Sequence, residues 1–317
     1  MTVISSSRPG ADRPRADHSG ADRPSAARPR ADRSRTGRVL TYALVVALAL
    51  AIAVPVAWVL LASLKRKSEF FGSPWTLPKG LHVQNYVDAF VTAHMGAYFL
   101  TSVLVTLLGL VIVLAVSVPA AYVVARYEFR GKGVVELALL GGLFVNVNYI
   151  VVPIFLMLVG WDRSLSDVFP GGFFIDNPAV LSLVYAATSI PFTIYLLTAY
   201  FRSIPVDYEE AAALDGASRF RIMTTIMLPM ARPAVTTVIL FNFLAYWNDF
   251  IISLTLLPGD HKTLQVGLLN LFTAQKAAAD YGRLYAGMVI VIVPVLLVYA
   301  VIQRRLIEGI SAGGVKG

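Results

Sequence analysis

Long runs without charged side chains dominate this chain and limit what it can fold into. A helix needs about 20 apolar residues to cross the ~30 Å hydrocarbon core of a bilayer. In chain order, runs of at least that length occupy residues 39–64, 95–125, 137–161 and 177–201, a fifth runs from Pro233 past Asp249 to about Leu257, and a sixth covers 284–303. Hydrophobic residues make up 57% of the chain and charged residues only 15%, against about a quarter charged in soluble domains. The sequence therefore predicts an all-α polytopic membrane protein with six transmembrane helices.

The net charge of +8 would suggest a nucleic-acid partner if it were spread over a folded surface. Nine arginines and four aspartates instead lie in residues 1–38, a low-complexity segment rich in Arg, Pro and Ala. Such a segment cannot bury enough surface to offset its ordering entropy, so we expect a disordered tail and no nucleic-acid partner. A basic tail before an apolar run also resembles a secretory signal. Because the run over 39–64 exceeds the usual hydrophobic region of a signal, we expect it to be retained as the first span.

Lysine and arginine accumulate on the cytosolic side of membrane proteins. If residues 1–38 are cytosolic, nineteen of the 27 basic residues fall on inner segments and eight on outer segments. This predicts cytosolic termini, with residues 65–94 extracytoplasmic, 95–304 forming the transmembrane core and 305–317 forming a cytosolic C-terminal tail. The cluster Lys65-Arg66-Lys67 lies on the predicted outer side and locally opposes the rule.

The segment 206–229, between the fourth and fifth runs, is charged but does not have the composition of a loop. Alanine, glutamate and leucine favour helix over 206–214, and Gly216 can take the left-handed position that ends a helix. Ser218 is a suitable N-cap for a second short helix over 219–227, which Pro229 would close. From the spacing alone, this segment could also be an interfacial linker between two spans.

The same segment resembles the motif of ABC importer permease subunits, E-A-A-x-x-D-G-A followed by I-x-L-P. The matching residues are Glu210, Ala211, Ala212, Asp215, Gly216, Ala217, Ile226, Leu228 and Pro229. The resemblance implies that the unit docks into a cleft of a cytosolic ATPase. The residues that it assigns to ATPase coupling are Glu209, Glu210, Ala211, Ala212, Asp215, Gly216, Ala217, Leu228 and Pro229.

The resemblance extends from about residue 40 to the C-terminus and is to the carbohydrate-uptake branch, MalG-type. The string W-N-D-F at 247–250 and the glycine-rich end over Leu306–Gly317 are similar to that branch. The implied partners are a second permease subunit in a heterodimer, two ABC ATPase subunits, an extracytoplasmic solute-binding protein, a sugar substrate and membrane lipid. ATP and Mg would be bound by the partner ATPase, with no cofactor in this chain, and transport would proceed by alternating access.

A candidate substrate path lies in the fifth run, at Asn242, Tyr246, Trp247, Asn248 and Asp249. An aspartate near the centre of a spanning helix costs about 2.5–3.5 kcal/mol, so Asp249 needs a reason to be there. Two interpretations stay open. The cluster could be an interfacial aromatic belt with a helix-capping Asn-Asp pair, or it could face a cavity that suits a polyhydroxylated ligand.

Other polar residues occur within the apolar runs. Asn146 and Asn148 would point to different sides of the third span, and Thr188, Ser189 and Pro191 would break the fourth. Hydrogen bonding between helices is the more frequent role of such residues.

The chain shows no sign of being an enzyme. It contains no cysteine and no G-x-x-x-x-G-K-[ST] motif, no histidine pair with metal-ligand spacing and no recognisable catalytic triad. An ion-coupled secondary transporter is the alternative from another class. It would need ionisable groups along the spans and usually an internal repeat, whereas a single Asp249 stands well inside a span. A membrane scaffold would leave the docking motif unexplained.

Overall fold

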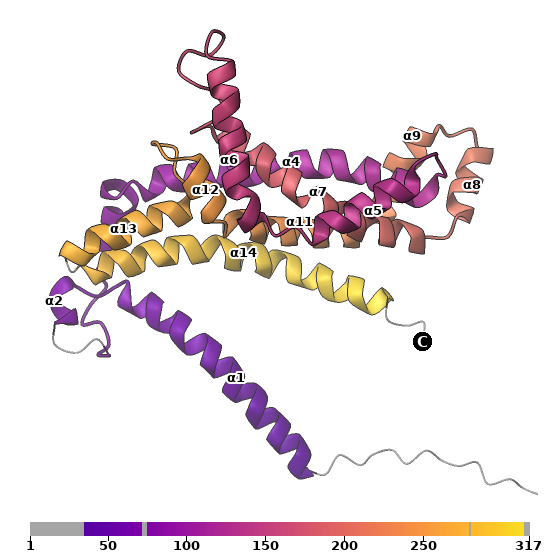
Figure 1. The fold of residues 1–317 in the computed structure, drawn as a ribbon. Coiled ribbons are helices and arrows are strands. Elements are labelled where there is room, and N and C mark those ends of the chain that lie inside the picture. The colour runs from indigo at the N-terminus through magenta and orange to yellow at the C-terminus, as the bar shows by residue number, and fades with distance from the viewer. Residues whose placement is uncertain (1–34, 72–74, 279, 314–317) are drawn as a thin grey trace, which may run out of the picture. The chain divides into compact units, whose positions relative to one another are not determined.

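The computed structural model describes residues 35–71, 75–278 and 280–313, and these residues form helices and their connections (Figure 1). The elements in chain order are α1 (Arg35–Ala62), α2 (Lys67–Phe70), α3 (Gln84–Val87), the π-helical turn η1 (Asp88–Thr92), α4 (Met95–Arg126), α5 (Lys132–Leu143), α6 (Val147–Ser164), α7 (Pro178–Ser203), α8 (Asp207–Leu214), α9 (Arg219–Ile222), the π-helical turn η2 (Met223–Met227), α10 (Leu228–Met230), α11 (Arg232–Trp247), α12 (Ile251–Leu256), α13 (Leu264–Ala278) and α14 (Tyr281–Gly313). Most of the segment predicted to be disordered, 1–38, lies outside the described residues, and its end from Arg35 already belongs to α1.

The chain divides into two compact units, residues 1–53 and residues 54–317. In the first unit, the described residues form the N-terminal part of α1, and the side chains over 37–53 are exposed. The second unit contains the end of α1 and all the later helices.

Five helices are long and apolar enough to cross a membrane, and they lie within α1, α4, α6, α7 and α14. A sixth candidate is obtained if Arg219–Met230 and Arg232–Trp247, which meet at a bend of 75°, count as one span. The prediction of an all-helical chain with about six spans is confirmed.

Two of the predicted spans were expected to be continuous helices, but each is divided into two helices. In both cases a side chain caps the second helix at the interruption. The third, over 137–161, is divided into α5 and α6. Asn146 is the N-cap of α6, where its side-chain oxygen accepts the backbone N–H of Asn148 at 3.0 Å. A side chain that supplies this bond favours a helix start within an otherwise apolar run.

The other interrupted run is 233–257, which forms α11 and the short helix α12. The carboxylate of Asp249 lies between them and accepts the backbone N–H groups of Ile252 at 3.4 Å and Ser253 at 2.9 Å. The predicted break at Thr188–Pro191 is also wrong, because α7 continues through it. The Thr188 hydroxyl bonds to the carbonyl of Val184, within the same helix, at 3.0 Å.

The C-terminal part differs from the predicted boundaries at two places. Helix α13 lies in a segment expected to be an outer connection, where the apolar stretch is too short to give a spanning signal. Helix α14 continues to Gly313, so residues 305–313 of the predicted tail are helical.

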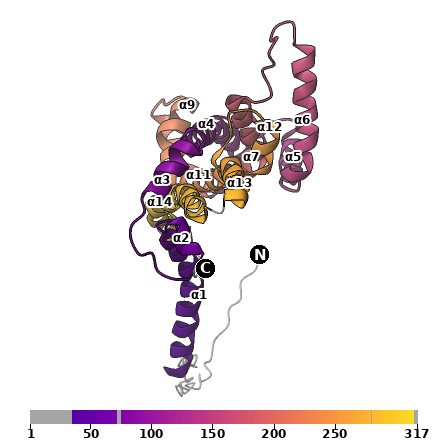
Figure 2. The ribbon, with the colours of Figure 1, turned by 90° about the vertical axis from the view of Figure 1, so that its left-hand side faces the viewer.

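Helices α4 and α7 form the most extensive helix pair among the described residues and lie side by side in both views (Figure 1 and Figure 2). Small side chains make this close approach possible. The buried small residues on the two helices include Ser102, Thr106, Gly109, Ser117, Ala121, Ser182, Ala186 and Thr193. A Cβ added to Gly109 would lie 3.4 Å from the carbonyl oxygen of Ser182 on α7.

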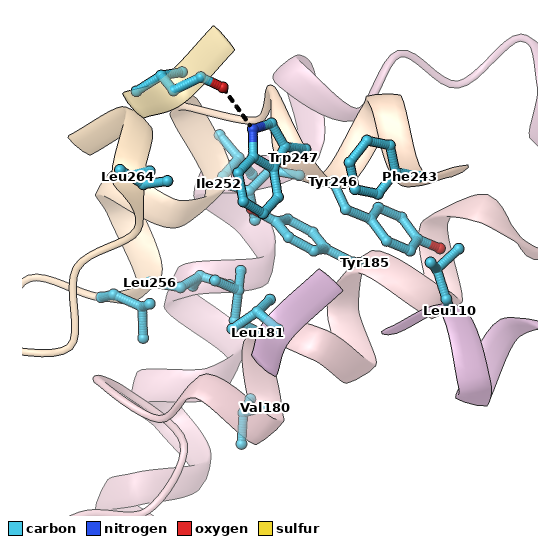
Figure 3. Close-up of a cluster of buried hydrophobic side chains, with 14 of the residues drawn as sticks. Leu110, Val180, Leu181, Tyr185, Phe243, Tyr246, Trp247, Ile252, Leu256 and Leu264 are labelled. Carbon is cyan, nitrogen blue, oxygen red and sulfur yellow. Dashed lines mark hydrogen bonds between the residues drawn. The ribbon is translucent and has the colours of Figure 1, made fainter. Parts of the chain in front are cut away.

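Two clusters of buried apolar side chains form the core along this pair. One joins α4 and α7 to α11, α12, α13 and α14, and its aromatic centre contains Tyr185, Phe243, Tyr246 and Trp247 (Figure 3). The other surrounds the C-terminal ends of α4 and α7 and includes Phe201 together with Ala212, Ile222 and Met227 from the segment α8–η2. The segment 206–229 is therefore part of the folded core.

The cluster Lys65-Arg66-Lys67 has a local explanation. Lys65 is fully buried, with its ammonium 4.6 Å from the ring centre of Trp58 and 5.5 Å from that of Phe70. Aromatic faces attract a desolvated cation, so this lysine contributes to packing as well as to the charge of the segment.

Candidate functional site

The segment 206–229, here called the coupling unit, folds as the sequence predicts over its first part. Helix α8 ends at Leu214, and Gly216 follows with φ of +80°, a conformation that glycine adopts at low cost. Ser218 caps α9 by accepting the N–H of Arg221 at 3.4 Å. The second helix is less regular than predicted, because α9 passes into η2 and α10 before the chain turns at Ala231. Pro229 lies inside α10 rather than after the last helical turn.

The residues assigned to ATPase coupling divide into an exposed and a buried set. Glu210, Ala211, Asp215 and Gly216 are exposed, and Leu214 beside them is 90% exposed. Figure 1 shows α8 and α9 together at one end of the α4–α7 pair. An exposed leucine next to small and acidic residues forms a surface that a partner protein could cover.

The buried set faces the core. Ala212 is only 8% exposed and packs in the cluster around Phe201, while Ala217, Leu228 and Pro229 are half-buried. Alanine at 212 lets α8 approach the ends of the spanning helices closely. These positions fix the unit to the rest of the chain.

Glu209 also turns inward. One of its carboxylate oxygens lies 2.5 Å from Nε of Arg126, the last residue of α4, and the other accepts the hydroxyl of Tyr122 at 2.7 Å. The guanidinium of Arg126 donates in addition to the carbonyl of Ile204, at the end of α7, at 2.7 Å. From the sequence, Arg126 counted only as one of the nineteen basic residues on inner segments. The signal that could have found it is its position as the first cation after a charge-free run.

The second candidate site is a cavity of about 180 Å³ between α6, α7, α11 and α12. Its lining residues are Val147, Asn148, Tyr185, Thr188, Ser189, Ala245, Tyr246, Asp249 and Ile252. Tyr185 donates its hydroxyl to the Asp249 carboxylate at 2.6 Å and stacks on Tyr246 with ring centres 5.1 Å apart. The cavity therefore combines a carboxylate, hydroxyl groups and aromatic rings.

Of the five residues predicted for the substrate path, two line this cavity, namely Tyr246 and Asp249. Asp249 also caps α12, so it combines the capping role of the first interpretation with the cavity position of the second. Asn242 is buried and donates to the hydroxyl of Thr193 at 3.0 Å. Asn248 is exposed, and its amide bonds to the carbonyl of Leu244 within the same helix at 2.8 Å.

Trp247 is 3% exposed and does not belong to the cavity lining. Its indole N–H donates to the carbonyl of Val291 on α14 at 3.1 Å, as Figure 3 shows, and its ring stacks on Phe243 at 5.6 Å. Tyr185 is the cavity residue that the sequence analysis missed. A tyrosine in an apolar run needs a hydrogen-bond partner, and Asp249 was the available carboxylate.

Two connecting loops, those that follow α6 and α12, are held by carboxylates. Asp162 accepts three consecutive backbone N–H groups, those of Phe173, Phe174 and Ile175, at 2.6–3.1 Å. Asp176 accepts the N–H of Gly259 at 3.0 Å and lies 3.1 Å from the imidazole of His261. The loops that follow α6 and α12 are thus ordered and joined to each other.

No group of three or more His, Cys, Asp or Glu residues that could hold a metal ion occurs in the part of the chain that the structure describes.

Comparison with known proteins shows the family to which the chain belongs. Residues 118–311, which include the coupling unit and the cavity, match the family described as the inner membrane component of binding-protein-dependent transport systems. The chain belongs to this family. It is a transport subunit of the cytoplasmic membrane with several spans, and this excludes the alternative of an ion-coupled secondary transporter.

Several relatives are sugar permeases by their names. The chain is 38% identical to the diacetylchitobiose uptake system permease protein NgcG of Streptomyces coelicolor, over 86% of this chain and 87% of that one. It is 30% identical to the trehalose/maltose transport system permease protein MalG of Thermococcus litoralis, over 83% and 91%. Among solved structures, a chain of a bacterial ABC transporter that imports the acidic polysaccharide alginate matches with a TM-score of 0.70. That match is 24% identical and covers 86% of this chain and 98% of the other, so it shows the fold alone.

Proposed function

We propose that the chain is a permease subunit of an ATP-driven, binding-protein-dependent importer for a sugar or oligosaccharide. In this proposal it pairs with a second permease subunit, and a solute-binding protein delivers substrate from outside. Two cytosolic ABC ATPase subunits bind ATP and Mg and dock on the coupling unit, so both termini of this chain are cytosolic. The observation that carries the proposal is the exposed set of the coupling unit, Glu210, Ala211, Asp215 and Gly216, on a segment that the buried side chains of Ala212, Ile222 and Met227 hold against the core.

The choice of a sugar is supported by the names of the relatives and by the chemistry of the cavity. Stacked rings of Tyr185 and Tyr246 suit the apolar faces of a sugar ring, and Asp249 and nearby hydroxyl groups suit its hydroxyls. The cavity of about 180 Å³ is smaller than the ~300–1,000 Å³ of typical ligand sites. This supports a path that the second permease completes, with the present chain forming half of it.

Coupling requires contacts that differ between the inward- and outward-facing states. Closure of the ATPase pair on ATP would move the coupling unit, and the second core cluster would carry that movement into α4 and α7. Tyr185 on α7 and Gly109 on α4, which lies against the ring of Tyr246, place the same two helices at the cavity. The fold therefore offers a direct physical route between the two candidate sites.

The test is Glu210→Lys, measured as ATP-dependent sugar uptake by the assembled transporter in proteoliposomes. We expect uptake to be abolished and less ATPase to co-purify, because the reversed charge lies on the exposed surface of α8. The control is Glu128→Lys, which reverses a side chain that is 89% exposed, just after α4 and outside the coupling unit, and removes only a surface ion pair with Lys132. Normal uptake by the Glu210 variant, at a normal level in the membrane, would contradict the docking role.

A further inference from the structure

Two adjacent glutamates of the coupling unit, Glu209 just before the motif and Glu210 at its first position, face different surroundings. Glu210 is exposed, whereas the side chain of Glu209 retains 15% of its exposure and lies against Arg126, whose side chain retains 9%. Adjacent positions on a helix point about 100° apart, so the two residues cannot serve the same surface. The carboxylate of Glu209 is directed at the end of α4.

Glu209 makes one ion pair, with Arg126, and one hydrogen bond, with Tyr122. Its carboxylate is held by Arg126 at 2.5 Å and by Tyr122 at 2.7 Å, one helical turn apart on α4. Arg126 donates at the same time to the carbonyl of Ile204 at 2.7 Å, which brings in the end of α7. One set of polar contacts therefore joins three elements, α4, α7 and α8.

Stability alone does not account for such a set of contacts. A buried ion pair repays its desolvation only in part, and apolar residues of similar volume often stabilise a protein as well or better. The apolar contacts of Ala212, Ile222 and Met227 already hold the unit against the core. What they lack is direction, because hydrophobic burial is roughly proportional to area and permits sliding. The ion pair and hydrogen bonds fix one orientation of α8 relative to the spanning helices.

We infer that Tyr122, Arg126 and Glu209 form a joint that transmits the movement of the coupling unit to α4 and α7. Glu209 is then a positioning residue within this chain and does not contact the ATPase. Along α4, the joint is seventeen residues from Gly109, about 26 Å at 1.5 Å per residue. Along α7, Ile204 is nineteen residues from Tyr185, about 28 Å by the same rise. Both helices are continuous between the joint and the cavity, through Pro119 in α4 and Pro191 in α7.

This inference rests on the proposed coupling of an ATPase to the unit, and its test separates the two. The assembled transporter is reconstituted in proteoliposomes, and three quantities are measured: ATPase co-purification, ATP hydrolysis, and sugar molecules imported per ATP. In Glu209→Gln the charge is lost but the side chain keeps its shape. We expect normal co-purification and continued hydrolysis, with at least a fivefold lower import per ATP, the low end of typical coupling between sites.

Two further variants keep the test decisive. Tyr122→Phe removes only one hydroxyl and should lower import per ATP by about two- to thirtyfold, the range for residues along a coupling network. The exchange Arg126→Glu with Glu209→Arg restores opposite charges and should recover more import per ATP than either single change. If Glu209→Gln imports with the wild-type ratio, or if it loses ATPase as Glu210→Lys is expected to, the joint is refuted. Normal uptake by Glu210→Lys would instead refute the docking role itself.

Discussion

Replacing Trp247 with phenylalanine tests whether this residue packs the core or lines the path. The change removes the indole N–H bond to Val291, which is worth about 1 kcal/mol. It also leaves a small void beside Phe243, since phenylalanine is smaller than the buried indole, at a cost of about 1–2 kcal/mol. At about 2–4 °C per kcal/mol in mid-sized domains, the sum of roughly 2–3 kcal/mol lowers the melting temperature by about 4–12 °C.

The assay is the loss of monodisperse transporter after heating, followed by gel filtration of the detergent-solubilised complex. The matched control is Trp161→Phe on α6, because Trp161 is 46% exposed. This change should shift the melting temperature by less than roughly 2 °C. We expect Trp247→Phe to leave the concentration dependence of sugar uptake unchanged. An unchanged melting temperature together with altered substrate dependence would place Trp247 in the substrate path and refute the packing argument.

Two further predictions concern the cavity and the turn of the coupling unit. Asp249→Asn largely keeps the cap of α12 but removes the charge next to Tyr185. We therefore expect changed sugar selectivity in uptake assays, with normal ATPase co-purification. Unchanged uptake kinetics would leave Asp249 with the capping role alone. Gly216→Ala meets no atom within 4 Å but places a side chain at φ of +80°, so we expect a loss of about 1 kcal/mol, localised to the unit and measurable as faster hydrogen exchange in α8. Wild-type exchange would show that the turn does not need glycine.

The sequence predicted the number of apolar runs and the first turn of the coupling unit well, because both depend on local chemistry. Charge-free length predicts a spanning helix, and Gly216 and Ser218 define their turn within a few residues. The breaks within the third and fifth runs were missed for a related reason. Asn146 and Asp249 act there as helix caps, and a polar residue in an apolar run has the same appearance whether it caps, bonds to a neighbour or binds a ligand.

The contacts that give the sites their shape could not be predicted, because they join residues far apart in the chain. Tyr122 and Glu209 are 87 positions apart, and Tyr185 and Asp249 are 64. The resemblance assigned Glu209 and Glu210 the same coupling role, and only the rotation of α8 against α4 separates them. In the same way, Trp247 and Tyr246 are neighbours in sequence but point into different surroundings.

The row of small side chains between α4 and α7 has a consequence for the transport cycle. Small side chains, several with hydroxyl groups, fill the contact between α4 and α7. If the two helices separated, Ser182, Thr193 and their neighbours would lose their close contacts, and no bulky residue there could fill the space. We therefore expect α4 and α7 to move together as one rigid body. On the proposed function, we expect the path for sugar to open along the outer surfaces of this pair, where it would meet the second permease subunit.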